Sequence, residues 1–223
     1  SPSLVTDGLV THLEADQGVS TTNGNVTAWA DQSGQGNDLT AYGDPVLVQD
    51  ALNGQPAISL DGDNLSRSGA LSGLPAGDQN RTMFVVTRYD GANAWGGAAF
   101  GNGAPNEAFG LVVNGGDGQL TVQGWGGGND LVSTTQGTGT GWLVQSATVD
   151  GDQVTHYLNG TQIDSGSHTY ATNLEKFVVG EEIAGAGYVD MEIATVLVYD
   201  RALSDTERQQ VEAYLEDKYA GGA

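Results

Sequence analysis

The chain has 223 residues, a length that suits one all-β domain, and carries 28 Asp and Glu against 7 Lys and Arg, for a formal net charge of −21. Nucleic acids and anionic membrane surfaces are bound through clustered cations, so this charge balance argues against both as partners. The absence of cysteine excludes disulfides and cysteine-based catalysis. We expect a single monomeric domain over residues 1–223, without insertion in a membrane.

The sequence shows no signal peptide and no long apolar run, and it begins Ser1-Pro2-Ser3. This start fits a chain from which a leader or a preceding domain has been removed. Together with the lack of cysteine, it leads us to expect a secreted or cell-surface protein of bacterial or archaeal origin.

Short apolar segments alternate with clusters of Gly, Asn and Asp along most of the chain, which contains 35 glycines. Regular spacing of this kind is typical of an antiparallel β-sandwich. The expected strands are residues 9–15, 56–61, 81–89, 109–114, 119–125, 142–150, 154–159, 177–180 and 188–199. Residues 83–86 and 196–199 are apolar on both faces, which predicts central strands.

One helix is expected, at the C-terminal end. Ser204 and Glu207 have the spacing of a capping box, in which the two side chains bond the free amides of a first helical turn. Apolar side chains then recur on one helical face at Val211, Tyr214, Leu215 and Tyr219. The pattern predicts a helix over about residues 204–219 that lies against the sandwich.

Several short motifs punctuate the expected strands. They are Trp29-Ala30-Asp31-Gln32-Ser33-Gly34 with Asn37 and Leu39, Ser59-Leu60-Asp61-Gly62, Arg81-Thr82, Tyr157-Leu158-Asn159-Gly160 and Tyr199-Asp200-Arg201-Ala202-Leu203-Ser204. This set resembles the laminin G-like domains of the concanavalin A-like lectin and glucanase superfamily. The resemblance implies a jelly roll of two antiparallel sheets, often used to hold sugars or other surface ligands and often containing a structural calcium ion.

Two tryptophans, Trp95 and Trp125, lie in glycine-rich segments without apolar neighbours. An exposed indole can stack on the C–H face of a sugar ring while nearby polar side chains bond the hydroxyls. We therefore predict a carbohydrate site in the loops between residues 89 and 140. Its other candidate residues are Tyr89, Asp90, Asn102, Asn129 and Asp130. The alternative is that both indoles fold down as caps on the sandwich.

Asp61, Asp63 and Asn64 place three oxygen-bearing side chains around Gly62. Calcium prefers such oxygen ligands, so these residues are the candidate Ca²⁺ ligands. Hydrogen bonding of Asx turns explains the same residues without a metal.

A catalytic role has weaker support. Asp190 and Glu192 alternate on an expected strand and therefore share a face, as the paired carboxylates of a glycoside hydrolase do. The strand continues without a further acid, and His12, His156 and His168 are scattered along the chain. No nucleophile–base arrangement is evident.

The leading hypothesis is an extracellular, non-catalytic, lectin-like module that binds a polysaccharide or a cell-surface glycan, with Ca²⁺ as its cofactor, within a larger secreted enzyme or adhesin. Two alternatives are a polysaccharide lyase or glycoside hydrolase on the same fold, and an adhesion or spacer domain without a glycan site.

Overall fold

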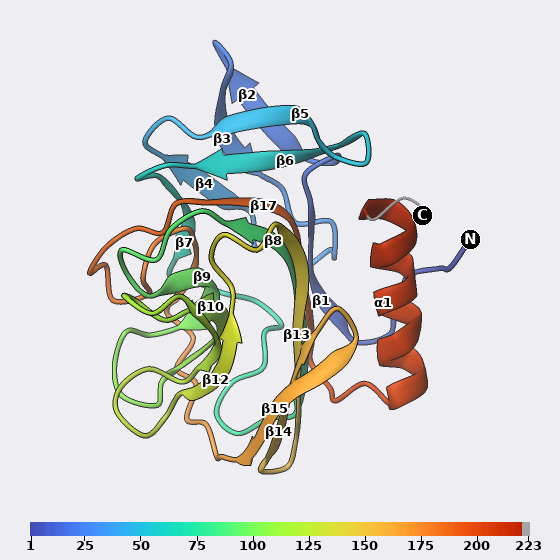
Figure 1. Cartoon of the computed structure of the whole chain (residues 1–223), viewed down its shortest axis with the longest axis vertical. Coiled ribbons are helices and arrows are strands. Elements are labelled where there is room, and N and C mark those ends of the chain that lie inside the picture. Colours follow the sequence, from blue (N-terminus) through green and yellow to red (C-terminus); the bar gives the residue numbers. More distant parts are fainter. Residues whose placement is uncertain (220–223) are drawn as a thin grey trace.

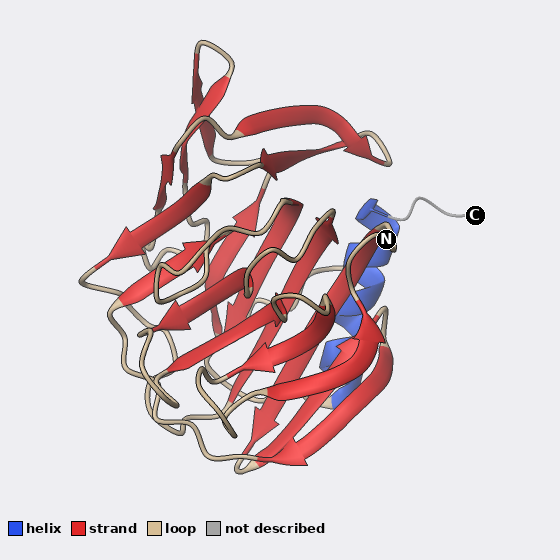
Figure 2. Cartoon of the chain, turned by 60° about the vertical axis from the view of Figure 1, so that its left-hand side comes forward, coloured by secondary structure: helices blue, strands red, loops and turns tan. Residues whose placement is uncertain are grey.

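The structure, a computed structural model, describes residues 1–219 as two facing layers of antiparallel strands with a helix on the outside of one layer (Figures 1 and 2). The described strands are β1 Leu9–Glu14, β2 Val19–Thr22, β3 Asn25–Trp29, β4 Leu39–Tyr42, β5 Val46–Leu52, β6 Gln55–Leu60, β7 Asn64–Ser68, β8 Arg81–Tyr89, β9 Gly96–Gly101, β10 Ala108–Val113, β11 Gln119–Gln123, β12 Leu131–Gln136, β13 Trp142–Asp150, β14 Gln153–Leu158, β15 Thr161–Ser167, β16 Lys176–Val179 and β17 Met191–Tyr199. The helix is α1, Asp205–Tyr219. The predicted all-β sandwich with one C-terminal helix is confirmed.

One layer follows the order β15-β14-β13-β8-β17. Beyond β17 it divides, because the first half of β17 pairs with β6 and the second half pairs with β1. The other layer follows the order β12-β11-β10-β9-β16-β7-β4-β3-β2. In the first layer β5 pairs with β6, and a single bridge between Asn25 and Val46 links β3 of the second layer to β5. Every strand-to-strand ladder is antiparallel.

Strand β8 shows why the central segments are apolar on both faces. Met83 and Val85 belong to the core between the two layers. Phe84 and Val86 face the other way and pack with Val211 and the rest of the apolar face of α1. The helix therefore buries the outer face of the layer that contains β8, β13 and β17, which confirms the predicted central position of β8 (Figure 1).

The capping box is present. The Ser204 amide donates to Glu207 Oε2 over 2.9 Å, and the Glu207 amide donates to Ser204 Oγ over 3.3 Å. Two hydrogen bonds from the Arg201 guanidinium, of 2.8 and 2.9 Å, hold the same Glu207 carboxylate. The helix thus begins where the sequence predicts it to begin. Within residues 1–219, no helix is long and apolar enough to cross a lipid bilayer.

The segment between residues 89 and 140 differs in part from expectation. The expected strands at 109–114 and 119–125 are present as β10 and β11, but β9 and β12 occupy stretches that were expected to be glycine-rich loops. Glycines are needed inside β9 and β10 because neighbouring chains approach closely: a Cβ atom at Gly97 would lie 2.4 Å from the Leu111 carbonyl oxygen, and one at Gly110 would lie 2.5 Å from Ala99 Cβ. Here glycine indicates tight strand packing, which composition alone does not distinguish from a loop.

Candidate functional site

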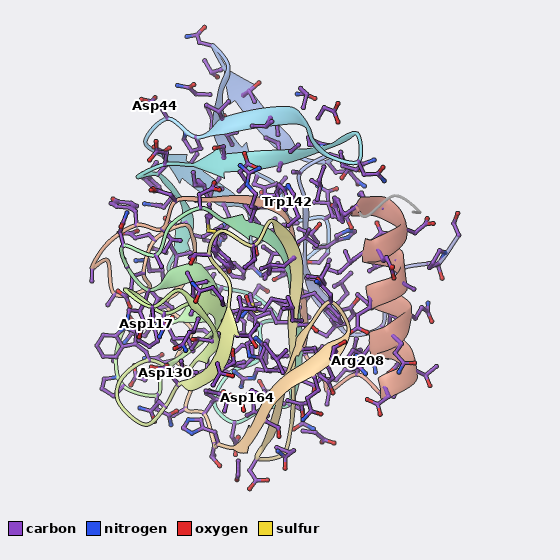
Figure 3. All side chains as sticks on the ribbon, in the orientation of Figure 1. Asp44, Asp117, Asp130, Trp142, Asp164 and Arg208 are labelled. Atoms are coloured by element: carbon purple, nitrogen blue, oxygen red, sulfur yellow. The ribbon has the colours of Figure 1, made fainter. Side chains whose placement is uncertain are left out.

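A cleft of about 640 Å³ opens where three connections meet. The β8–β9 connection supplies Trp95, the β11–β12 connection supplies Trp125 and Asp130, and the β16–β17 connection supplies Glu182. The cleft is also lined by Gln123, Val132 and glycines 126–128. Figure 3 shows Asp130 on the side of the molecule away from α1. The two tryptophans singled out in the sequence therefore line one concavity.

Short-range hydrogen bonds fix the Trp125 loop. Trp125 has a φ of 70°, a left-handed conformation that is uncommon for a residue with a side chain. Asp130 Oδ1 accepts the amides of Gly124 and Trp125, each over 2.9 Å. The Asn129 side-chain amide donates to the Trp125 carbonyl over 3.1 Å. Asn129 and Asp130 thus hold the loop in shape, whether or not they also contact a ligand.

Glu182 fixes the indole itself. Trp125 Nε1 donates to Glu182 Oε1 over 2.5 Å, and Glu182 Oε2 accepts the amides of Ala184 and Ala186 over 2.8 and 3.3 Å. The half-buried indole also packs on a small apolar cluster that includes Ile183. Its orientation is therefore set before any ligand arrives.

Trp95 is also half-buried, so neither tryptophan is a freely projecting platform. Its indole is backed by the β10–β11 turn, where a Cβ atom at Gly115 would lie 2.8 Å from Trp95 Cδ1. Each ring thus buries part of its surface against the protein and contributes the remainder to the cleft wall. Both readings of the sequence, stacking surface and cap, describe part of this arrangement.

The cleft has acidic and neutral polar groups. Burial is the main cause of a raised pKa at Asp130; the hydrogen bonds from Trp125 and Gly124 and the nearby His168 oppose this rise, and the Glu182 carboxylate adds to it. Gln123 presents an amide at the same wall. Among the described residues that line the cleft, none is Lys or Arg.

The other candidate binding residues lie outside the cleft lining. Tyr89 is fully buried in the core, and its hydroxyl contacts Gln145 Oε1 at 3.4 Å, so the prediction of Tyr89 as a surface contact is wrong. Tyr89 ends a central strand whose alternation turns its ring inward. Asp90 is exposed and pairs with Arg88 at 3.3 Å. Asn102 donates to Glu107 Oε2 over 2.8 Å in a separate loop.

Two of the three candidate calcium ligands, Asp61 and Asp63, use their side-chain oxygens on other partners. Asp63 Oδ1 accepts the Asp44 amide over 2.8 Å, and Asp63 Oδ2 accepts the Asp61 amide over 3.3 Å, as in an Asx turn. The Asp61 side chain contacts Asp190, whose pKa is raised by burial, by the Asp61 charge and by that contact. Asn64 is buried at the start of β7, and its Oδ1 has no hydrogen-bond partner among the described residues. In residues 1–219 no cluster of three or more acidic or histidine side chains is placed to hold a metal. A calcium ion bound by these three residues therefore stays a prediction, in which the Asn64 oxygen is the one without another partner in the described part of the chain.

The possible catalytic groups lie apart. Glu192 pairs with Arg88 at 3.3 Å. His156 is buried beside Gln145, with the two Nε2 atoms 3.0 Å apart, whereas His12 contacts Glu14 and His168 contacts Asn106. None of these side chains lines the cleft.

Sequence reasoning missed Glu182, Gln123 and Val132. Gln123 and Val132 lie next to the Trp125 loop at the adjoining ends of β11 and β12. Glu182 is 57 residues from Trp125 in sequence, and only the pairing of β16 with β9 brings its loop beside the tryptophan. One signal was available: Glu182 is the second residue after a predicted strand, in a loop where site residues are often found.

A family model described as the concanavalin A-like lectin/glucanases superfamily, of laminin G type, matches residues 61–207, more than half of the sequence. The chain belongs to this superfamily. The match includes every described residue that lines the cleft. A search among curated protein sequences finds no relative of the chain.

Solved structures of this superfamily's shape match nearly the whole chain at low sequence identity. The binding domain of Paraclostridial Mosquitocidal Protein 1 matches with a TM-score of 0.68 and 17% identity, over 96% of this chain and 53% of that chain. Domain 4 of an extracellular arabinanase from Geobacillus stearothermophilus, solved with arabinotriose, matches with a TM-score of 0.67 and 19% identity, over 92% of this chain and 98% of that domain. The binding domain of Botulinum Neurotoxin DC, solved with SialylT, matches with a TM-score of 0.65 and 12% identity, over 94% of this chain and 52% of that chain. The chain thus spans about half the length of the two toxin domains.

Proposed function

We propose that this protein is a non-catalytic carbohydrate-binding module whose glycan lies in the cleft between Trp95 and Trp125. The observation that carries the proposal is the convergence of two half-buried indoles with Gln123 and Asp130 on one concave surface. Sugars combine apolar C–H faces with hydroxyl groups, and a site with aromatic walls and a few polar groups complements both.

The comparisons support this proposal. Domain 4 of the arabinanase, which the chain covers almost completely, was solved with arabinotriose, and a toxin binding domain was solved with SialylT. The arabinanase is described as extracellular, which supports a secreted or cell-surface location here as well. A module of this kind would serve to hold a larger enzyme or adhesin on a polysaccharide or on a cell-surface glycan.

The test is affinity electrophoresis of the 223-residue chain through gels that contain soluble neutral polysaccharides such as arabinan, xylan and mannan, followed by calorimetry on any that retards it. We expect Trp95→Ala and Trp125→Ala each to weaken binding by about 1–3 kcal/mol, the scale of a lost aromatic contact.

Trp142→Ala is the matched control. Trp142 is also half-buried, but it lines a different groove of about 550 Å³ between β13 and α1, well away from Asp130 (Figure 3). Its loss should leave glycan affinity unchanged. Equal weakening by all three substitutions would contradict the assignment of the cleft, and release of sugar products from a bound polysaccharide would show an enzyme instead.

A further inference from the structure

We propose that the cleft selects uncharged glycans and rejects glycans that carry carboxylate or sulfate groups. This inference rests on the proposed function, because it concerns the same cleft. It follows from the charges that line the cleft and from the positions of the cations elsewhere in the described chain.

Two carboxylates line the cleft, and no Lys or Arg is found among its described lining residues to balance them. Asp130 and Glu182 both line it, and each carboxylate is held in place by hydrogen bonds from the protein. Glu182 is only 5% exposed, and its two oxygens already accept from Trp125 and from two backbone amides. An incoming carboxylate or sulfate would therefore approach fixed negative charge in a partly dehydrated site, where like charges repel strongly.

All seven Lys and Arg residues of the chain lie within residues 1–219, and each has contacts outside the cleft. Arg81 is buried in the core with its guanidinium over the Phe109 ring. Lys176 lies on β16, the strand that leads to the Glu182 loop, and it donates to the Ile183 carbonyl over 3.1 Å. The other five interact with partners near β7, β8 and α1, as seen for Arg67, Arg88, Arg201, Arg208 and Lys218. Recognition of an acidic sugar uses a charge-assisted bond to such a cation.

A neutral sugar has what this cleft requires. Both backbone donors to Asp130 reach Oδ1, so Oδ2 is the oxygen available to accept a sugar hydroxyl. The Gln123 amide supplies a donor and an acceptor, and the indoles supply apolar surface. The protein's formal charge of −21 adds long-range repulsion of polyanions, which salt screens, whereas exclusion by the cleft carboxylates acts at short range.

The experiment compares matched polymers in affinity electrophoresis: hydroxyethylcellulose with carboxymethylcellulose, arabinoxylan with glucuronoxylan, and methyl-esterified pectin with polygalacturonate, each at low and at high salt. For whichever backbone retards the protein, we expect the uncharged member to bind roughly tenfold or more tightly than its acidic partner, and the preference to persist at high salt.

Substitution of Val132 tests whether the negative charge of the cleft causes the preference for neutral glycans. It lies on the cleft wall, on β12, and is 39% exposed, so a long polar side chain fits there without entering the core. Val132→Lys should bring the affinity for the acidic polymer to within a few-fold of that for its neutral partner, while Val132→Gln should leave the preference as in the wild type. Asp130→Asn, which keeps the Oδ1 acceptor, should shift the preference in the same direction as Val132→Lys.

The outcomes separate the two proposals. If acidic polymers retard the protein as strongly as neutral ones do, the proposed charge selectivity is wrong, but the cleft can still be a glycan site. Selectivity that Val132→Lys and Asp130→Asn both fail to change would also overturn it, because the cleft charges would not be its cause. Absence of retardation by every polymer, neutral or acidic, would overturn the proposed function itself.

Discussion

Trp125 and Glu182 are joined by a hydrogen bond of 2.5 Å from the indole Nε1 to the carboxylate Oε1, although 57 residues separate them in sequence. The bond connects two of the three loops that form the cleft. Because the remaining Glu182 oxygen accepts two backbone amides of its own loop, the indole is tied to the backbone through one buried side chain. A ring held in this way loses little conformational freedom on binding, which favours affinity.

The first prediction concerns this bond. Trp125→Phe keeps an aromatic ring but removes the Nε1 donor, and so leaves a buried carboxylate oxygen without its partner. We expect a loss of about 1–3 kcal/mol in the free energy of unfolding, the usual range for such a group. Urea denaturation of Trp125→Phe, Glu182→Gln and the double variant would measure it. If the two single effects simply add, the bond does not couple the two residues.

The second prediction concerns the support behind Trp95. A methyl group at Gly115 would lie 2.8 Å from Trp95 Cδ1 and 3.1 Å from the Trp95 backbone nitrogen, so Gly115→Ala must displace the indole. We expect glycan affinity to fall by about tenfold, comparable to loss of one aromatic contact. Gly91→Ala is the control, because Gly91 does not line the cleft and a Cβ there would have as its nearest neighbour Asp190 Oδ2, at an ordinary contact distance of 3.7 Å. Calorimetric titration of both variants with the same polysaccharide checks the prediction, and equal affinities would refute it.

The third prediction concerns acid stability. Burial alone would raise the pKa of Glu14. The hydrogen bonds from His12 and Lys218 and the Lys218 charge outweigh this effect, so the pKa falls from the usual 4.5 to about 2. A carboxylate with a depressed pKa in the folded state stabilises the protein above its unfolded pKa, and that stabilisation is lost as pH falls from 4.5 toward 2.

The contribution of Glu14 at neutral pH should be about 3 kcal/mol. Denaturant titrations between pH 2 and 7 should therefore show a shallower acid loss for Glu14→Gln than for the wild type. Asp217→Asn, at an exposed site on α1, should keep the wild-type profile. Identical profiles for the wild type and Glu14→Gln would contradict the role of Glu14.

The fourth prediction concerns the capping box. Ser204→Ala removes the acceptor of the Glu207 amide and should lower the free energy of unfolding by about 1 kcal/mol, while Ser204→Asp should keep most of it. Thermal denaturation followed by circular dichroism provides the comparison. A larger loss for Ser204→Asp than for Ser204→Ala would show that the cap is not formed in solution.

The fold was largely predictable because its signals are local. Alternation and turn residues indicate strands, and Ser204 with Glu207 indicates the start of α1 within a few residues of chain. Trp95 and Trp125, both singled out from the sequence, line one cleft. By contrast, the partner of Trp125 depends on β16 pairing with β9, a long-range contact that no local pattern encodes. Tyr89 was misplaced for a related reason, since its inward orientation follows from the register of β8 against β13 and β17.

The position of β17 has a consequence for how the protein is made. This strand pairs with β8 along its length and with β6 and β1 on its other edge, so three strands acquire their full set of partners only when residues 191–199 are available. A ribosome delivers this segment after nearly all of the rest of the domain. Until then β1, β6 and β8 present unpaired edges that invite association with other chains. Closure of the sheet is therefore a late event in synthesis, and a chain that stops before Met191 is expected to aggregate instead of folding to a smaller stable core.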